Sequence, residues 1–297
     1  MLNRNQIAFI FNSQLKETEI EARNLLKSLG INDRAWVCSA EKLVDKSEAL
    51  NETSLLIVVG GDGTILRTIR AVSAYNIPVL GVNMGKVGFM AELRPDEAIA
   101  RIPEFIQFTE TGEGSIRVEE RMMLVADIIP DNAEDARFSV HALNDVTIGT
   151  SGVSSLVELV TSVNGVHLTN YRADAVIVST ATGSTGYALS AGGPIVFPEA
   201  KMMMMLPVAP HTGLRDGLIL EPNSFIEIEP LSGYEASISA DGFKDTKLNP
   251  GEKIRIQKGL YTAKFLRAHQ PDFFYSALNL RLGLAYRSQR PPNIPGS

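Results

Sequence analysis

Apolar and polar positions follow two different patterns along the chain, and the change falls near residue 110. Before that point, continuous apolar runs at residues 7–11, 55–59 and 77–82 are separated by segments with apolar residues at helical spacing. Short apolar runs of this kind are typical of strands buried in a parallel sheet. Their alternation with helical segments indicates βαβ units.

The helical segments carry recognisable start and stop signals. Residues 16–29 place Ile20, Leu25 and Leu29 at helical spacing, and Gly30 follows where a helix would end. Residues 65–74 are predicted to form a second helix. A third is expected from Pro95, with this proline in its first turn. Residues 1–110 are therefore predicted to form an α/β domain with an open, mostly parallel sheet.

Beyond residue 110 the pattern is that of short strands rich in Val and Ile. Strands are predicted at residues 118–129, 138–148, 155–163, 166–171, 175–179, 225–228, 236–240, 253–257 and 262–266. Asn164-Gly165 predicts a two-residue hairpin turn. The methionines at 202–205 are interpreted as a buried strand rather than a redox or metal cluster, because Met fills irregular cores. These features predict an all-β domain over residues 111–272.

The C-terminal part differs again. Residues 273–288 are predicted to form a helix that packs back on the first domain, and residues 289–297 to form a loose tail.

Composition supports an ordinary two-domain globular protein. The chain has 297 residues, of which 44% are hydrophobic and 21% charged. A net charge of −6 without a dense Lys/Arg run argues against a nucleic-acid or membrane partner. No apolar run reaches the roughly 20 residues of a membrane span. A single cysteine, Cys38, and the lack of a secretory pattern at the N-terminus predict a cytoplasmic protein.

The first candidate for chemistry is Gly60-Gly61-Asp62-Gly63-Thr64, between a buried strand and a helix. Glycines let the backbone approach a ligand, and the helix N-terminus offers amide donors to phosphate. Asp62 is placed to accept a proton from an attacking hydroxyl or to help hold Mg²⁺. The alternative is a plain turn with Asp62 as helix N-cap. The string is neither a Walker A loop nor a GxGxxG fingerprint.

Two further segments are rich in hydrogen-bonding groups. Residues 174–194 place hydroxyls, amides and glycines densely together, and Tyr187 is positioned to stack on or cap a base. Asn144 and Asp145 suit recognition of an adenine edge or two ribose hydroxyls. The four histidines show no metal-ligand spacing, so no metal site is predicted within the protein.

These motifs together resemble the NAD kinase family over nearly the whole chain. The matching segments are GGDGT at 60–64, Gly-x-x-Gly-Phe at 85–89, the Asn-acid pair at 144–145, the block at 174–187, Ser-Ala-Gly-Gly-Pro at 190–194, Pro-His-Thr at 210–212 and Ser-x-Asp-Gly at 239–242. The chain departs from the family pattern with Asp145 for Glu, Ala181 for Pro, Gly186 for Ala and Phe243 for Gln. These departures indicate a divergent branch.

The resemblance implies an NAD kinase-like fold and a phosphoryl transfer from ATP with Mg²⁺ to the adenosine-ribose 2′-hydroxyl of NAD. Asp62 would be the catalytic residue. The residues implied to hold the nucleotides are Gly61, Gly63, Phe89, Asn144, Asp145, Arg172, Asp174, Thr182, Thr185, Gly186, Tyr187, Ser190 and Asp241. A homodimer or homotetramer is expected.

Several alternatives stay open at this point. One is a non-catalytic NAD(P)-binding regulatory protein, and another is a GGDGT-class kinase acting on a lipid or sugar. The sequence also leaves open NAD or NADH as acceptor, and ATP or polyphosphate as donor.

Overall fold

The computed structural model describes residues 4–85, 88–150, 156–231 and 233–282, which form two compact units. Unit 1 comprises Met1–Val72, Ile77–Val118 and Phe265–Ser297, and unit 2 comprises Ser73–Asn76 and Glu119–Lys264. The expected tail at 289–297 and the expected helical residues 283–288 lie outside the described residues, as do Lys86 and Val87.

Unit 1 is built on a parallel sheet. Its strands, in spatial order, are β2 (Ala35–Ser39), β1 (Gln6–Phe11), β3 (Thr53–Val59) and β4 (Val79–Val82). Every neighbouring pair in this order is parallel, and Phe265 pairs with Val79 in the same sense. The three strands predicted here are present. β2 was not predicted: its apolar run AWVC is only four residues long, and the first three residues of the strand are only partly buried.

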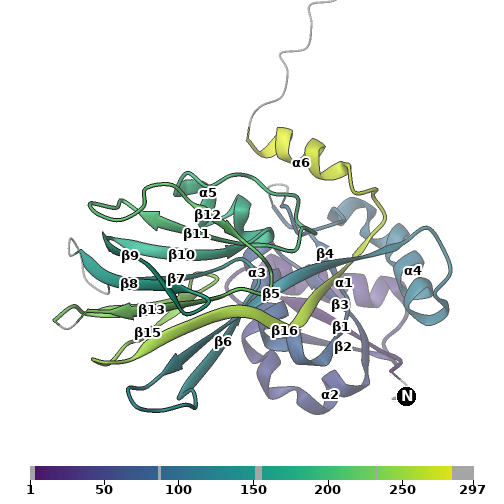
Figure 1. The fold of residues 1–297 in the computed structure, drawn as a ribbon. Helices are drawn as coiled ribbons and strands as arrows, with labels where there is room; N and C mark the ends of the chain where they lie inside the picture. Colours follow the sequence, from purple (N-terminus) through teal and green to yellow (C-terminus); the bar gives the residue numbers. More distant parts are fainter. Residues whose placement is uncertain (1–3, 86–87, 151–155, 232, 283–297) are drawn as a thin grey trace, which may run out of the picture. The chain divides into compact units, whose positions relative to one another are not determined.

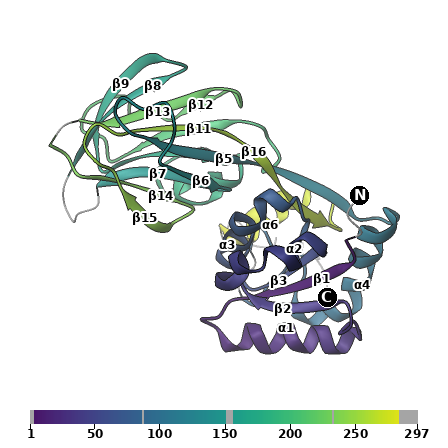
Figure 2. The same ribbon diagram turned by 90° about the horizontal axis from the view of Figure 1, so that it is seen from below.

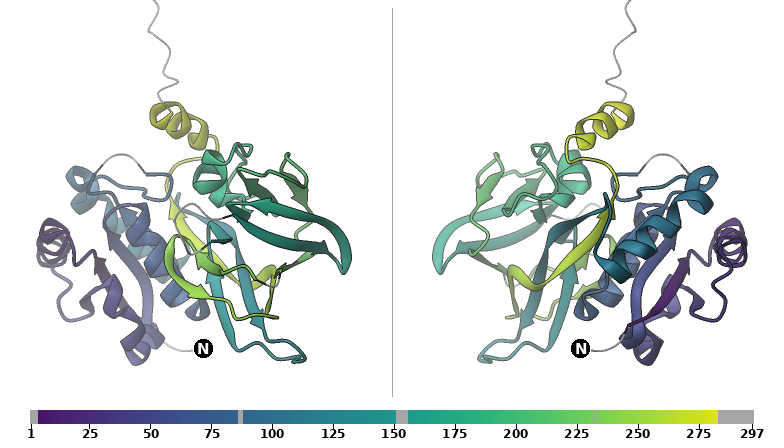
Figure 3. Two further views of the ribbon diagram at one scale, coloured as in Figure 1. Left: turned by 90° about the vertical axis from the view of Figure 1, so that its left-hand side faces the viewer. Right: turned by 90° about the vertical axis from the view of Figure 1, so that its right-hand side faces the viewer.

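Helices cover both faces of this sheet, as Figures 2 and 3 show. The helices of unit 1 within the described residues are α1 (Lys16–Leu29), α2 (Ser47–Glu52), α3 (Asp62–Val72), α4 (Pro95–Thr111) and α6 (Phe273–Arg281), with the 3₁₀ turn η1 (Ala40–Asp45). A second 3₁₀ turn, η2 (Ser73–Tyr75), follows α3 and is grouped with unit 2. α1 and α4 share one apolar core with the sheet through Leu25, Phe105 and Ile57. Gly30 ends α1 at φ 67°, as predicted.

One expectation for α1 is wrong. Ile20 is 59% exposed and does not face the core. Thr18 is buried in this region of the helix instead. Its hydroxyl oxygen lies 2.8 Å from the Asn12 carbonyl oxygen and 2.7 Å from the Leu15 carbonyl oxygen, so its single hydrogen has an acceptor, which offsets the cost of burying a polar side chain.

Unit 2 packs two antiparallel sheets around one apolar core (Figure 1). The first has the order β12 (Leu218–Leu220), β11 (Met203–Val208), β10 (Ala175–Thr180), β7 (Asp145–Thr150), β14 (Ala236–Ala240), β15 (Phe243–Lys247). The second contains β16 (Lys253–Arg267), β13 (Phe225–Pro230), β8 (Val157–Val163) and β9 (Val166–Ala173), with β5 (Arg117–Ile129) and β6 (Phe138–Ala142) joined to it through β16.

Most predicted features of unit 2 are confirmed. Asn164 and Gly165 have φ of 53° and 78° and join β8 to β9 as a two-residue hairpin. The methionines of β11 are buried in a strand. The helical pieces within the described residues of this unit are short: the turn η2, the 3₁₀ turn η3 (Thr182–Thr185) and the four-residue α5 (Tyr187–Ser190).

Two strand predictions are wrong. The strand expected at 138–148 is two strands, β6 and β7, which belong to different sheets and are separated at Leu143 and Asn144. The two strands expected at 253–257 and 262–266 form the single strand β16. Gly259 does not mark a turn: a Cβ there would lie 3.3 Å from the Met123 carbonyl oxygen of β5, so the glycine permits a close approach of two strands.

Among the described residues, no helix is long and apolar enough to cross a membrane.

Candidate active site

The glycine-rich turn of unit 1 follows directly from β3. The strand ends at Val59, and α3 begins at Asp62. A Cβ at Gly60 would lie 2.6 Å from the Thr64 hydroxyl oxygen, so glycine is required where the first helical turn folds back on the strand. The turn therefore places a carboxylate at the N-terminus of an 11-residue helix, whose amides and dipole favour anions.

The side chain of Asp62 points away from its own helix. Its Oδ2 accepts hydrogen bonds from the Phe89 amide at 3.0 Å and from Nη2 of Arg281 at 2.9 Å, and its Oδ1 accepts one from the Met90 amide at 3.2 Å. An N-cap side chain would instead accept from the N2 or N3 amide of α3. The plain N-cap alternative therefore does not describe Asp62, which joins three distant parts of unit 1.

The Gly-x-x-Gly-Phe motif at 85–89 needs a glycine at position 88 because the carboxylate of Asp62 lies directly against it. A Cβ at this position would lie 2.0 Å from Oδ1 of Asp62. Any other residue would displace the carboxylate, because no side chain tolerates such an approach. The GGDGT turn and the Gly88-Phe89 segment thus form one unit, in which the second holds the carboxylate of the first.

A buried ion pair supports the segment that grips Asp62. Arg267 donates to the Met90 carbonyl at 2.8 Å and to Glu92 at 3.2 Å. The side chains of Arg267 and Glu92 are only 7% and 3% exposed. Glu92 also accepts from the amides of Ala268 and His269 at 2.8 and 3.1 Å. Satisfied charge networks of this kind rigidify their surroundings, here the chain around Phe89 and Met90.

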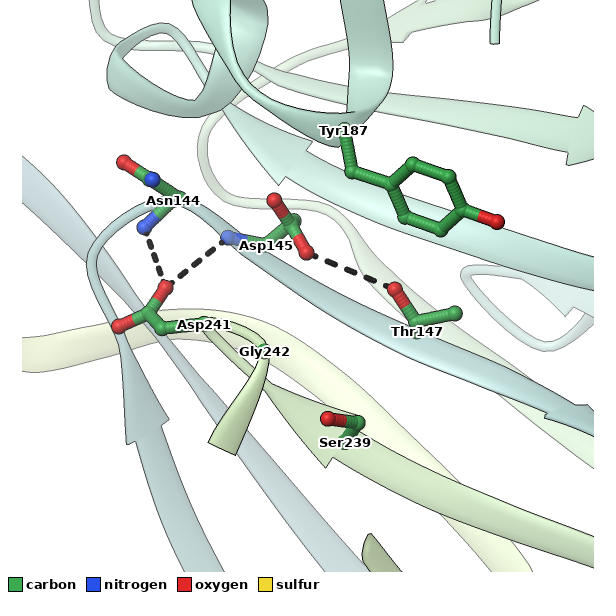
Figure 4. A pocket seen from close by; sticks show the side chains of 7 residues that line it. All are labelled: Asn144, Asp145, Thr147, Tyr187, Ser239, Asp241 and Gly242. Atoms are coloured by element: carbon green, nitrogen blue, oxygen red, sulfur yellow. Dashed lines mark hydrogen bonds between the residues drawn. The ribbon is translucent and has the colours of Figure 1, made fainter. Parts of the chain in front are cut away.

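Unit 2 contains a separate candidate binding site, a pocket of about 340 Å³ (Figure 4). Polar side chains from β7, β14, α5 and the turn between β14 and β15 surround it. The lining residues are Asn144, Asp145, Thr147, Tyr187, Ser239, Asp241 and Gly242. A polar concave site of this size suits part of a nucleotide.

Asp241 organises the chain beside this pocket. It lies in a tight turn with Gly242, at φ of 53° and 70°, and such values favour an Asp-Gly pair. Its carboxylate accepts from three successive amides, at 2.9 Å from Leu143, 2.7 Å from Asn144 and 3.2 Å from Asp145. These bonds explain why the predicted strand 138–148 is interrupted: the amides at its centre bond a side chain instead of continuing one ladder.

Asp145 is the buried carboxylate of the pocket, with 6% of its surface exposed. Burial, reinforced by the negative charge of Asp241, raises its pKa to about 7, while a hydrogen bond from Thr147 acts in the opposite direction. The Thr147 hydroxyl lies 3.5 Å from Oδ1 of Asp145. Near neutral pH this carboxyl is therefore poised between its two protonation states.

The hydroxyl-rich block 179–186 packs directly against the same loop. Thr180 donates from its hydroxyl to the Leu143 carbonyl at 2.6 Å, and its amide donates to the Asn144 carbonyl at 2.9 Å. A Cβ on Gly183 would lie 2.2 Å from that Asn144 oxygen. The block therefore supports the loop of Asn144 and Asp145 from behind, while the pocket itself is lined by other residues.

The close approach at Gly183 gives a stability prediction. Gly183→Ala forces two backbone segments apart and is expected to lower the free energy of unfolding by about 3 kcal/mol or more. Denaturant unfolding of the purified variant measures this. Gly85→Ala is the matched control, because a Cβ there meets no atom within 4 Å. Equal stability of Gly183→Ala and the unmodified protein would contradict the packing described.

Two buried polar atoms near the pocket have no hydrogen-bond partner in the structure. They are Oδ1 of Asn144 and the hydroxyl oxygen of Thr182. Leaving a buried polar group unsatisfied costs about 1–3 kcal/mol. Asn144 lines the pocket, so its side-chain amide is a candidate ligand contact, whereas Thr182 lies outside the lining.

The remaining sequence-predicted residues lie in several places. Gly61, Gly63 and Phe89 belong to unit 1 around Asp62. Gly186 lies beside the pocket, where a Cβ would be 3.8 Å from Oδ2 of Asp145 and 3.6 Å from Nδ2 of Asn144. The residues that the structure does not bring to the pocket lining are Arg172, Asp174, Thr182, Thr185 and Ser190; of these, Arg172, Asp174 and Ser190 are exposed.

Three lining residues were not among the expected nucleotide contacts, although two of them, Ser239 and Gly242, lie in the Ser-x-Asp-Gly segment identified from the sequence. Thr147 lies two positions after Asp145, on the same face of β7. Ser239 pairs with Thr147 across the neighbouring strand β14, and Gly242 completes the turn after Asp241. The two-residue alternation along a strand could have found Thr147. The local motif contains Ser239, but its position beside Thr147 follows from the pairing of β14 with β7.

Comparisons with known proteins identify similar families and chains. The model of the ATP-NAD kinase N-terminal domain matches residues 1–110, and that of the ATP-NAD kinase C-terminal domain matches residues 143–268. The NAD kinase of Dehalococcoides mccartyi strain CBDB1 is 38% identical over 261 residues, which cover 86% of this chain and 87% of that protein. The NAD kinase of Natranaerobius thermophilus is 36% identical over 80% of each chain.

Two solved structures are also similar. The NAD kinase from Archaeoglobus fulgidus in complex with ATP has a TM-score of 0.70 and 25% identity, over 94% of this chain and 100% of that one. Yeast NADH kinase complexed with NADH has a TM-score of 0.81 at 24% identity, over 98% of this chain and 90% of that one, which is a likeness of fold.

Fold and sequence thus define a two-domain phosphotransferase. Both domain models match along the chain, and curated relatives exceed 30% identity over most of its length. The chain belongs to the ATP-NAD kinase family.

Proposed function

We propose that the protein is an NAD kinase, which transfers the γ-phosphoryl group of ATP to the adenosine-ribose 2′-hydroxyl of NAD and gives NADP. The observation that carries this proposal is the carboxylate of Asp62, held at a glycine-rich helix start by two amides and a guanidinium. Family membership supports the same reaction.

In the proposed reaction, the ribose oxygen bonds the γ-phosphorus as the bond from that phosphorus to the β–γ bridging oxygen breaks. ADP leaves with the electron pair of the broken bond. The hydroxyl proton passes to Asp62, or Asp62 orients the hydroxyl for attack. Amides at the start of α3, including those of Gly61 and Gly63, are proposed to bind phosphate.

The pocket of unit 2 is proposed to bind the dinucleotide. Ionised Asp145 offers two acceptor oxygens to a pair of vicinal ribose hydroxyls, and Tyr187 offers a half-exposed ring for stacking. The side-chain amide of Asn144 would supply a further contact. Arg172, Asp174, Thr182, Thr185, Gly186 and Ser190 stay predicted contacts from the resemblance.

Mg²⁺ is proposed to enter with ATP as part of the donor substrate. Among the described residues, no three His, Cys, Asp or Glu side chains are close enough together to hold a metal. Mg²⁺ commonly binds through one or two carboxylates together with substrate phosphates. A single carboxylate such as Asp62 therefore fits a metal that the triphosphate carries in.

The pKa of Asp145 gives a prediction for acceptor binding. A carboxyl with a pKa of about 7 in the free protein is mostly protonated at pH 6 and mostly ionised at pH 8. If the ionised form accepts the ribose hydroxyls, NAD affinity rises about tenfold between these pH values by linkage. Isothermal titration calorimetry at pH 6, 7 and 8 measures this. Asp145→Asn should bind NAD weakly and with a flat pH profile, and an equally steep profile in that variant would contradict the assignment.

An acceptor screen tests the reaction itself. The purified protein is incubated with ATP, Mg²⁺ and, in separate reactions, NAD, NADH, a diacylglycerol and a panel of hexoses. ADP release that depends on NAD or NADH supports the proposal. Release that depends on the lipid or a sugar would instead make the protein another GGDGT-class kinase. NAD binding without ADP release would make it a non-catalytic binding protein.

The cellular location and the oligomeric state of the protein are also proposals. We propose a cytoplasmic protein, because its single cysteine, Cys38, cannot form an internal disulfide. A homodimer or homotetramer stays a prediction, which sedimentation velocity tests.

A further inference from the structure

The last described helix of the chain contacts the proposed catalytic carboxylate. Arg281, the C-terminal residue of α6, donates from Nη2 to Oδ2 of Asp62 at 2.9 Å across a separation of 219 residues. Both side chains are about three-quarters buried, with exposures of 27% for Arg281 and 23% for Asp62. The pair is therefore less screened by water than a surface ion pair.

An aromatic ring holds the same guanidinium from another side. The guanidinium carbon of Arg281 lies 4.0 Å from the ring centroid of Phe89, within the range of a cation–π contact. The amide of Phe89 is itself a donor to Asp62. Arg281 thus contacts both the carboxylate and the residue that grips it.

A second contact from α6 fixes this arrangement. The ring of Phe274 lies 6.1 Å from that of Phe89 between centroids, in a tilted geometry. Phe274 and Arg281 are seven residues apart, so they lie on the same face of α6, two turns apart. The helix therefore meets the Phe89 segment at both ends, and the position of Arg281 does not depend on one contact alone.

These contacts fix the orientation of the Asp62 carboxylate. An ionised carboxylate has about four acceptor positions, and three are used by Phe89, Met90 and Arg281. Oδ2 takes two donors and Oδ1 takes one. The side chain is held in a single orientation, with the remaining acceptor position on Oδ1. Among the described residues, Arg281 is the one side chain that donates to Oδ2, and without it the contacts described above leave two backbone amides to restrain the carboxylate.

We propose that Arg281 is a positioning residue for phosphoryl transfer: its guanidinium orients the carboxylate of Asp62, which makes α6 part of the active site. The inference rests on the proposed role of Asp62. Positioning of a reacting group accelerates enzyme reactions, and a displacement of about 1 Å costs about a hundredfold in rate. The effect of Arg281 should therefore fall on turnover and should require Asp62.

The test uses kcat and KM of the full chain. Arg281→Met removes the charge and keeps an unbranched apolar side chain against the Phe89 ring. We expect kcat to fall about tenfold to a hundredfold, with both KM values changed less than about threefold. Arg281→Lys keeps the charge and should recover a large part of the loss. Arg23→Met is the matched control, because it breaks an exposed Arg–Glu pair on α1 and should leave kcat unchanged.

A double-mutant cycle distinguishes positioning from a structural role. If Arg281 acts through Asp62, Arg281→Met causes no further loss in the Asp62→Asn background. The inference is overturned if kcat is unchanged in Arg281→Met, or if Arg281→Met causes an equal further loss of kcat in the Asp62→Asn background. A raised KM for ATP at constant kcat in Arg281→Met would also overturn it, as would an Arg281→Lys variant as slow as Arg281→Met. Full activity of Asp62→Asn would overturn the role of Asp62 and this inference together. An inactive Asp62→Asn with a fully active Arg281→Met would overturn the inference alone.

Discussion

Asp62→Asn is expected to lower kcat by about a thousandfold while NAD binding stays within about threefold of the unmodified protein. The amide keeps the shape of the side chain but cannot take the hydroxyl proton. One of its terminal atoms is also a donor and would face the Phe89 amide, Arg281 or the Met90 amide, all of which donate to the carboxylate. Steady-state kinetics and calorimetry with NAD measure the two quantities.

The control for this variant is Asp96→Asn. Asp96 also lies in the first turn of a helix, α4, but its side chain is 68% exposed and pairs only with Arg94 among the contacts described. We expect its kcat to be unchanged. Normal turnover in Asp62→Asn would remove this residue from the reaction, whereas loss of NAD binding with loss of turnover would indicate that Asp62 holds the acceptor.

Asp241→Asn is expected to raise the KM for NAD about tenfold to a hundredfold at pH 8, with a smaller effect on kcat. The carboxylate of Asp241 accepts from three backbone amides that shape the loop of Asn144 and Asp145. An amide side chain has one acceptor atom, so at least one buried donor loses its partner, at a cost of about 1–3 kcal/mol. Initial rates over a range of NAD concentrations measure the change.

Asp241→Asn is also expected to lower the pKa of Asp145, which by itself favours NAD binding. Asp241 is a like charge that raises the pKa of Asp145, and removing it favours the ionised form. The midpoint of the pH dependence of NAD binding should therefore move to lower pH in Asp241→Asn. Asp127→Asn, which removes a surface carboxylate of β5, is the control and should change neither quantity. An unchanged KM and midpoint in Asp241→Asn would contradict the role given to this turn.

Local signals in the sequence were sufficient for much of the fold. The strand before Gly60, the turn and the start of the helix at Asp62 lie within a short stretch, and each carries its own pattern of burial or glycine. The Asn164-Gly165 hairpin and the end of α1 at Gly30 are equally local. In these places the structure needs no distant partner to specify it.

The errors arise where a distant segment overrides the local pattern. The apolar alternation across 138–148 continues past Asn144, but the carboxylate of Asp241 takes the amides at that point and the chain changes sheet. Gly259 looks like a turn residue in isolation, yet it lies within one long strand, where a Cβ would make a tight contact of 3.3 Å with the backbone of β5.

In the candidate site, too, local motifs were predictable and long-range contacts were not. Asp62, Asn144, Asp145, Tyr187 and Asp241 could be selected because their motifs are contiguous. The contact between Asp62 and Arg281 joins residues 219 positions apart, and it depends on how α6 packs within unit 1. No periodicity or short motif contains that information.

The most direct test of the account is the position of the phosphate in the product. The purified protein is incubated with NAD, ATP and Mg²⁺, and the nucleotide products are analysed by phosphorus-31 NMR. The account predicts one new phosphomonoester, on the 2′-oxygen of the adenosine ribose, formed in step with ADP. ADP and inorganic phosphate without any new phosphomonoester, or a phosphate at another hydroxyl, would contradict it.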